Sequence, residues 1–181
     1  MTIRLVGANP GLSLFASPED EQPVAYASIW RVDWSSEGAG NAIVLWHEGR
    51  VRLIGQSPRL ASWLAGDFTR HFPEVAGLEW PVPELVAAPV AYESDLTHGV
   101  RAEGADVVVE ITEPMAIRSV RIVDFELGNA TNSLSTVIWP CRHGSVSLAG
   151  TRLSGAPRVN EDPISSSAFL ADAEVWSSSD N

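Results

Sequence analysis

Residues 41–56 read NAIVLWHEGRVRLIGQ, and this stretch predicts two antiparallel strands joined by a tight turn. Only Glu48 and Gly49 separate the runs 41–47 and 50–56, and such a two-residue loop ending in glycine is typical of a β-hairpin. The first run is apolar on both faces, which indicates a central strand. Arg50 and Arg52 mark one solvent-facing side of the second run. The middle of the chain is therefore predicted to be β structure.

The preceding run, residues 24–34 (VAYASIWRVDW), alternates with the period of a strand. Tyr26, Trp30 and Trp34 are expected on one face because residues two apart in a strand point the same way. Residues 35–40 (SSEGAG) suit a turn. Three strands are thus expected to follow one another as a meander.

One helix is predicted at about residues 57–72, directly after the hairpin. Ser57 can cap the first backbone N–H groups, Pro58 suits the first helical position, and Pro73 ends the pattern. Apolar side chains recur at spacings of three and four residues and form one stripe: Leu60, Trp63, Leu64, Phe68 and Phe72. This stripe is expected to pack against the sheet.

Further strands are expected at residues 105–112, 116–127, 134–139, 145–153 and 168–176. The apolar, proline-containing stretch 74–99 is expected to cover the core rather than to act as a lid. The predicted fold class is mainly β (α+β), an antiparallel curled sheet, barrel or sandwich of about 8–10 strands with one mid-chain helix. Residues 1–176 are expected to form a single domain, and residues 177–181 a disordered tail.

Charge and composition exclude several classes of function. The net charge is −11 and the twelve basic residues are all arginine and scattered, so neither nucleic acid nor an anionic membrane is an expected partner. The absence of lysine excludes Schiff-base enzymes, pyridoxal-phosphate enzymes, Ser-Lys hydrolases and P-loop nucleotidases.

Cofactor and metal sites lack a signal in the sequence. Cys141 is the only cysteine, so no internal disulfide and no multi-cysteine metal site can form within the chain. The four histidines have no metal-ligand spacing, and neither a metal nor a cofactor is expected. The sequence shows no secretory signal and no membrane-spanning run, which predicts a cytoplasmic location.

Aromatic residues give the leading functional hypothesis. Tyr26, Trp30 and Trp34, with Trp46 on a neighbouring strand, could line a concave sheet and hold a flat or sugar-like small molecule. The same rings would serve equally as core beneath the helix, which is the commoner use. A third interpretation is a structural homodimer, because aromatic residues are enriched at subunit interfaces.

The alternative of a different class is a lysine-independent hydrolase or isomerase. Glu93, Asp95 and His98 bring two carboxylates and an imidazole into one short polar stretch, and such groups can act as general acids and bases. A polar turn explains the same residues without any function. The enzyme hypothesis requires that the three side chains converge in a cleft.

Overall fold

A computed structural model describes residues 1–178, which form fifteen strands, one α-helix and two short 3-10 helices. The predicted fold class, mainly β with one mid-chain helix, is confirmed. The elements are β1 (Thr2–Ala8), β2 (Gly11–Leu14), β3 (Ala25–Ser35), β4 (Gly40–His47), β5 (Arg50–Gly55), α1 (Pro58–Asp67), η1 (Thr69–His71), η2 (Pro73–Val75), β6 (Glu84–Ala87), β7 (Val90–Asp95), β8 (Gly99–Gly104), β9 (Val107–Pro114), β10 (Arg118–Leu127), β11 (Ala130–Leu148), β12 (Thr151–Arg152), β13 (Val159–Glu161), β14 (Ile164–Ser166) and β15 (Ala168–Ser178).

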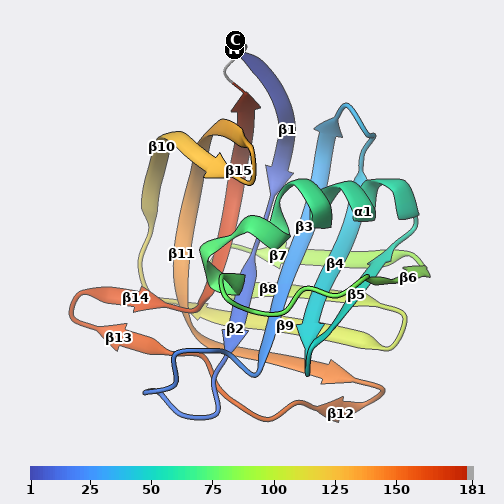
Figure 1. Cartoon of the computed structure of the whole chain (residues 1–181). Helices are drawn as coiled ribbons and strands as arrows, with labels where there is room; N and C mark the ends of the chain where they lie inside the picture. The colour runs from blue at the N-terminus through green and yellow to red at the C-terminus, as the bar shows by residue number, and fades with distance from the viewer. Residues whose placement is uncertain (179–181) are drawn as a thin grey trace.

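Thirteen of these strands form one sheet that folds back on itself. Its main path runs β6-β5-β4-β3-β1-β15-β11-β9-β8-β7. The 19-residue strand β11 joins the two halves, because its first part pairs with β10 and β15 and its second part with β9 and β12. The strands β7–β9 run across β3–β5 behind them (Figure 1). The structure is therefore closer to a sandwich than to a closed barrel.

The sheet was expected to be purely antiparallel, and one pair of strands differs from this expectation. β5 and β6 are parallel, since the connection through α1, η1 and η2 returns the chain to the same end of the sheet. The strand number exceeds the predicted 8–10 because short strands such as β2, β6 and β13 form in segments for which no strand was predicted.

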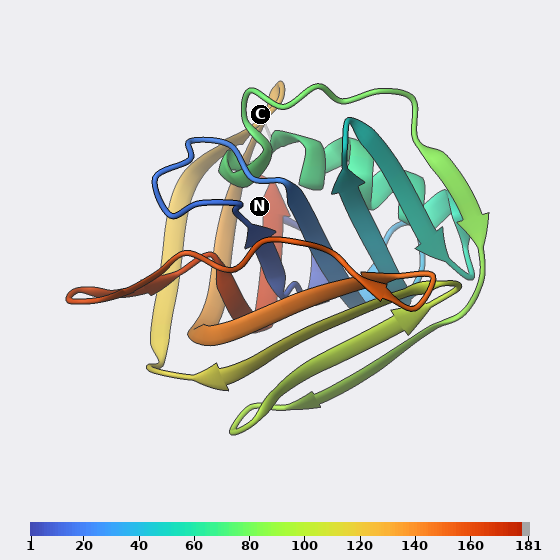
Figure 2. The same ribbon diagram turned by 90° about the horizontal axis from the view of Figure 1, so that it is seen from below.

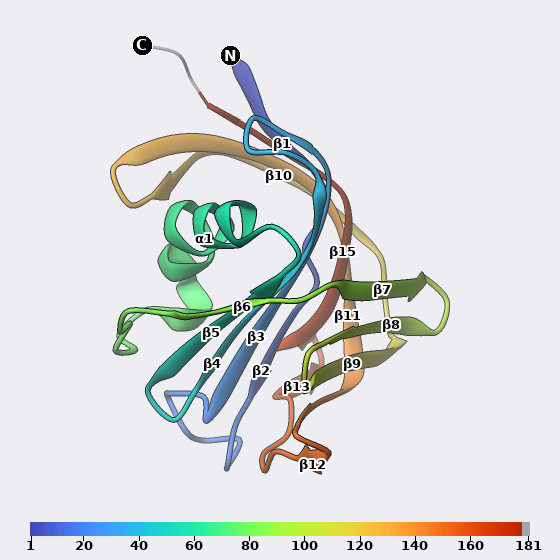
Figure 3. The same ribbon diagram turned by 90° about the vertical axis from the view of Figure 1, so that its right-hand side faces the viewer.

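Two hydrophobic cores lie on opposite faces of the β3–β5 layer. One fills the space between this layer and β7–β9 and is built from small and branched side chains such as Ile29, Leu45 and Val109. The other lies between the sheet and α1 and contains Trp30, Phe68 and Trp176. Seen from below and from the side, helix, first sheet layer and second sheet layer follow one another (Figures 2 and 3). The helix thus occupies the concave face.

The helix begins as predicted and ends earlier. The Ser57 side chain accepts a hydrogen bond from the Leu60 backbone N–H at 3.2 Å. The α-helix stops at Asp67 rather than near residue 72, and a 3-10 turn follows. In that turn Thr69 is fully buried, and its hydroxyl accepts a hydrogen bond from Trp30 Nε1 at 3.1 Å. The change from α-helix to 3-10 helix thus coincides with the hydrogen bond between Trp30 and Thr69, which the local sequence pattern does not predict.

The predicted hairpin is confirmed, with His47 opposite Arg50 and both turn residues at positive φ. Tyr26, Trp30 and Trp34 were predicted to share one face of β3, and of these three Tyr26 and Trp30 do so. A register shift against β1 leaves one extra residue between Val32 and Trp34, and Trp34 is 52% exposed. One extra residue in a strand turns every following side chain to the other face.

The two ends of the chain pair with each other. β15 extends through Ser178, where Ser177 lies opposite Ile3 and Ser178 opposite Thr2. The expected tail at 177–181 thus starts inside this strand, and residues 179–181 lie outside the described part of the chain. Within residues 1–178, no helix has the length and apolar character needed to cross a membrane.

Candidate functional site

A hollow of about 180 Å³ lies on the helix side of the sheet, between η2 and the strands β10, β11 and β15. We call it the β15 cavity. Its buried floor is formed by Asn9, Phe72, Leu134, Thr136, Ala171, Glu174 and Trp176. Its rim consists of partly exposed residues, chiefly Glu74, Val120, Ile122, Ile138 and Phe169, with Pro73 outermost. The lining is almost entirely apolar, and the rim opens toward solvent.

An irregularity in β15 aims Glu174 at this floor. Ser135 of β11 lies opposite Val175, whereas Val137 lies opposite Asp172, so one extra residue is inserted in β15. Ala173 takes the left-handed conformation with φ 51° at this bulge. Bulges re-aim side chains next to functional sites. Here the bulge places Ala171 and Glu174 on the same, cavity-facing side.

Glu174 is 3% exposed and is held at both carboxylate oxygens. Its Oε1 accepts a hydrogen bond from Trp176 Nε1 at 2.5 Å. Its Oε2 lies 3.4 Å from Thr136 Oγ1, and this hydroxyl also lies 3.3 Å from the backbone oxygen of Asp172. Among the described residues, no arginine or histidine lines the cavity. The carboxyl group therefore has hydrogen bonds but no cationic partner.

Burial raises the pKa of Glu174 to about 7, while the hydrogen bonds from Trp176 and Thr136 act in the opposite direction and Asp172 adds to the rise. Burial also raises the pKa of Glu74 at the rim. A carboxyl group with a pKa near 7 can both release and take up a proton at neutral pH. The floor is thus able to present either a hydrogen-bond donor or a negative charge.

Aromatic rings form one wall of the cavity. Phe72 stacks on Trp176 with 6.1 Å between ring centroids, and Phe125 meets Trp176 edge-on at 5.3 Å. The β10–β11 hairpin that carries Phe125 curls over the helix side of the sheet (Figure 3). A Cβ added at Gly128, in its turn, would lie 2.9 Å from the His71 ring, so the turn packs closely on η1. This contact holds the β10–β11 turn against η1.

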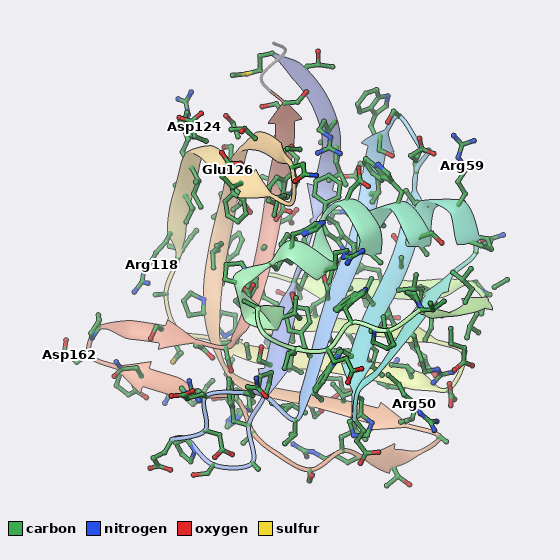
Figure 4. All side chains as sticks on the ribbon, in the orientation of Figure 1. Arg50, Arg59, Arg118, Asp124, Glu126 and Asp162 are labelled. Carbon is green, nitrogen blue, oxygen red and sulfur yellow. The ribbon has the colours of Figure 1, made fainter. Side chains whose placement is uncertain are left out.

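Charged residues of β10 stay outside the cavity. Arg118 and Asp124 point outward from the ribbon (Figure 4), and Arg121 is exposed as well. Ile122 and Phe125 face inward, and a register shift lies between them, where Asp124 has a φ of 61°. A second irregularity therefore keeps the apolar residues of this strand directed at the cavity.

The predicted ligand-binding residues lie elsewhere. Tyr26, Trp30 and Trp46 belong to the core beneath α1, and the Trp46 ring donates from Nε1 to the backbone oxygen of Glu79 at 2.9 Å. Trp34 lies apart from them on the outer face. None of the four lines the β15 cavity. The segment that contains Glu79 covers the core, as expected, since Leu78 and Trp80 pack on it.

The predicted catalytic residues lie on the exposed β7–β8 hairpin. The structure brings Asp95 and His98 together, with 3.0 Å between Oδ2 and Nδ1. Hydrogen bonds from the Thr97 hydroxyl, the Thr97 backbone and His98 lower the pKa of Asp95 to about 2. Glu93 borders the same shallow surface hollow, and all three side chains are exposed. The arrangement is that of a hydrogen-bonded turn in solvent, with no enclosing wall.

Cys141 and His143 are two residues apart on β11 but lie in different surroundings. Cys141 is fully buried, and burial raises the pKa of its thiol to about 11. His143 is exposed and lies 3.3 Å from Glu113 Oε1. In residues 1–178, no group of three histidine, cysteine, aspartate or glutamate side chains is arranged to hold a metal ion.

No family model, curated protein or solved structure matches this chain. The geometry of the β15 cavity is thus the basis for a functional hypothesis. Local sequence patterns do not reveal this cavity, because Asp172 and Glu174 are two residues apart and suggest one polar, solvent-facing side of a regular strand. The bulge at Ala173 turns Asp172 and Glu174 to different faces of β15.

Proposed function

We propose that this protein binds a small organic molecule in the β15 cavity. The observation that carries the proposal is an apolar hollow, open at its rim, with a buried carboxyl group at its floor. Binding sites for small molecules are typically concave and mostly apolar, with a few polar groups that fix orientation. The cavity has this character, although it lies beside the helix and not at Tyr26, Trp30, Trp34 and Trp46.

The size of the cavity limits the ligand. Its volume of about 180 Å³ is below the range of pockets that hold drug-sized molecules. An apolar cavity of about 150 Å³ is sufficient for benzene. The expected ligand is therefore a molecule with one ring or a short branched chain, with one end at Glu174 and the other at the rim.

The test uses single-ring probes and a variant that fills the cavity. Titration with benzene, benzyl alcohol and benzylamine should shift the NMR signal of the Trp176 indole N–H saturably for at least one probe, with Trp176→Phe identifying the signal. Ala171→Leu adds three carbons at the floor and should weaken binding of that probe at least about tenfold.

Ser135→Leu is the matched control, because Ser135 is exposed on β11 beside the floor residue Thr136. This variant should bind the probe as the unmodified protein does. Thermal unfolding followed by circular dichroism establishes that both variants are folded. Unchanged affinity in a folded Ala171→Leu protein, or the absence of a saturable shift with every probe, would contradict the proposal.

A further inference from the structure

We infer that the ligand of the β15 cavity carries a protonated amine on a small apolar body, an inference that rests on the proposed function. Glu174 at the floor and Glu74 at the rim are the ionisable groups that line the cavity in the described chain. Glu174 is buried, whereas Glu74 is partly exposed. The remaining lining is apolar apart from Asn9 and Thr136. A ligand in the cavity would therefore lie close to two carboxyl groups.

The charge of the cavity disfavours an anionic ligand. Two carboxyl groups and, among residues 1–178, no basic side chain line it, so an incoming carboxylate or phosphate would be repelled once these groups are ionised. A cation neutralises the buried carboxylate, which otherwise lacks a charged partner at 3% exposure. Arg4 pairs with Asp67 and Arg31 pairs with Asp172, and neither of these arginines lines the hollow.

The hydrogen-bonding groups at the floor are mostly acceptors. Glu174 Oε2 has only the 3.4 Å contact with Thr136. Asn9 donates through Nδ2 to Ser28 Oγ at 2.9 Å and to the Ile29 backbone oxygen at 2.8 Å. Both bonds use the amide nitrogen and fix the amide orientation, so Oδ1 is the acceptor atom of this side chain. An ammonium group, which has only donors, complements such a floor.

The aromatic wall supports the same choice. Phe72, Phe125 and Trp176 surround the floor near Glu174, and aromatic faces attract cations when water is excluded. The apolar body of the ligand would contact Ile122 and Ile138 toward the rim. The expected ligand is thus an aryl- or alkylamine whose nitrogen binds Glu174.

This assignment predicts a pH dependence of binding. Burial is the main cause of the raised pKa of Glu174, and Asp172 on its own strand adds to it. The other ionisable groups near Glu174 are Glu74 on η2, which lines the same cavity, and Tyr26 on β3, whose pKa is raised by burial, Glu74 and Glu174. The strands β10 and β11 present apolar side chains and Thr136. Burial and Asp172 disfavour a negative charge at Glu174, so the carboxylate forms as the pH rises through about 7. Amine affinity should rise over the same interval.

The experiment compares benzylamine, benzyl alcohol and benzoate, which share one ring and differ in charge. Calorimetry at about pH 8 should give a benzylamine Kd at least about tenfold lower than that of benzyl alcohol, and no binding of benzoate. At about pH 5.5 the preference for benzylamine should shrink several-fold. Glu174→Gln keeps the shape of the side chain and should weaken benzylamine at least about tenfold, while benzyl alcohol changes less than about threefold.

Glu126→Gln is the matched control, because Glu126 is an exposed carboxyl group on β10 and its loss changes the net charge equally. It should leave all three affinities unchanged. Glu74→Gln, at the partly exposed rim, provides a second variant and should weaken benzylamine about threefold. If benzyl alcohol or benzoate binds as tightly as benzylamine, the amine inference is overturned while the proposed function stands. If none of the three binds, the amine inference is overturned, and if benzene gives no saturable shift either, the proposed function is overturned as well.

Discussion

Replacement of Phe68 by alanine should lower the free energy of unfolding by about 3 to 5 kcal/mol. Phe68 is fully buried, and its ring lies edge-on to Trp30 at 5.6 Å, Trp63 at 5.0 Å and Trp176 at 5.3 Å. The substitution removes the apolar contact at the junction of helix and sheet and leaves a space that the surrounding rings cannot fill. Urea denaturation followed by circular dichroism measures the loss.

Val82→Ala is the control for this prediction. Val82 is 94% exposed in the segment after η2, and its truncation should change the free energy of unfolding by less than about 0.5 kcal/mol. A loss below about 1 kcal/mol for Phe68→Ala would mean that the helix does not pack on the sheet through this ring.

Glu174→Gln should remove a large part of the pH dependence of stability. The pKa of Glu174 is about 7 in the folded protein and 4.5 in the unfolded chain, so the folded state holds this proton more tightly. The associated stability is complete below about pH 4.5 and is lost as the pH rises through 7, by about 3 kcal/mol. Glutamine does not ionise and avoids this loss.

The measurement is the difference in unfolding free energy between Glu174→Gln and the unmodified protein at about pH 4.5 and pH 8. The difference should move by about 3 kcal/mol in favour of the variant at the higher pH. Glu126→Gln, at an exposed site, should give a difference that does not depend on pH. A pH-independent difference for Glu174→Gln would show that the carboxyl group is not sequestered.

Local sequence patterns were sufficient for the elements at the centre of the chain. The turn at Glu48 and Gly49 and the cap at Ser57 depend on residues within a few positions of each other, and both were predicted correctly. The helix stripe was also correct in its main consequence, because Leu60, Leu64 and Phe68 are buried in the core against the sheet.

Long-range contacts and single-residue irregularities explain what the sequence did not reveal. The bulges beside Trp34 and Ala173 each invert the faces of the residues that follow, so Trp34 points outward and Glu174 inward. The predicted strands 134–139 and 145–153 are joined without a break in β11, because Cys141, His143 and Gly144 between them pair with β9. No short pattern encodes these features, since each depends on the register of a partner strand distant in sequence.

The enzyme and homodimer hypotheses remain predictions. Glu93, Asp95 and His98 lie in solvent, which gives a reaction no shielded space. The proton-transfer capacity near neutral pH lies instead at Glu174. Glu174 is buried in apolar surroundings beside a cavity, whereas Glu93, Asp95 and His98 are exposed.

The most direct test of the account is the pKa of the Glu174 side chain, measured by carbon-13 NMR titration of the carboxyl signal with and without benzylamine. The signal is assigned through its loss in Glu174→Gln. We expect a pKa of about 7 in the free protein and a clearly lower value with saturating benzylamine, because an ammonium group favours the carboxylate. A pKa near the ordinary 4.5 that benzylamine does not change would contradict both the buried carboxyl group and its role in binding.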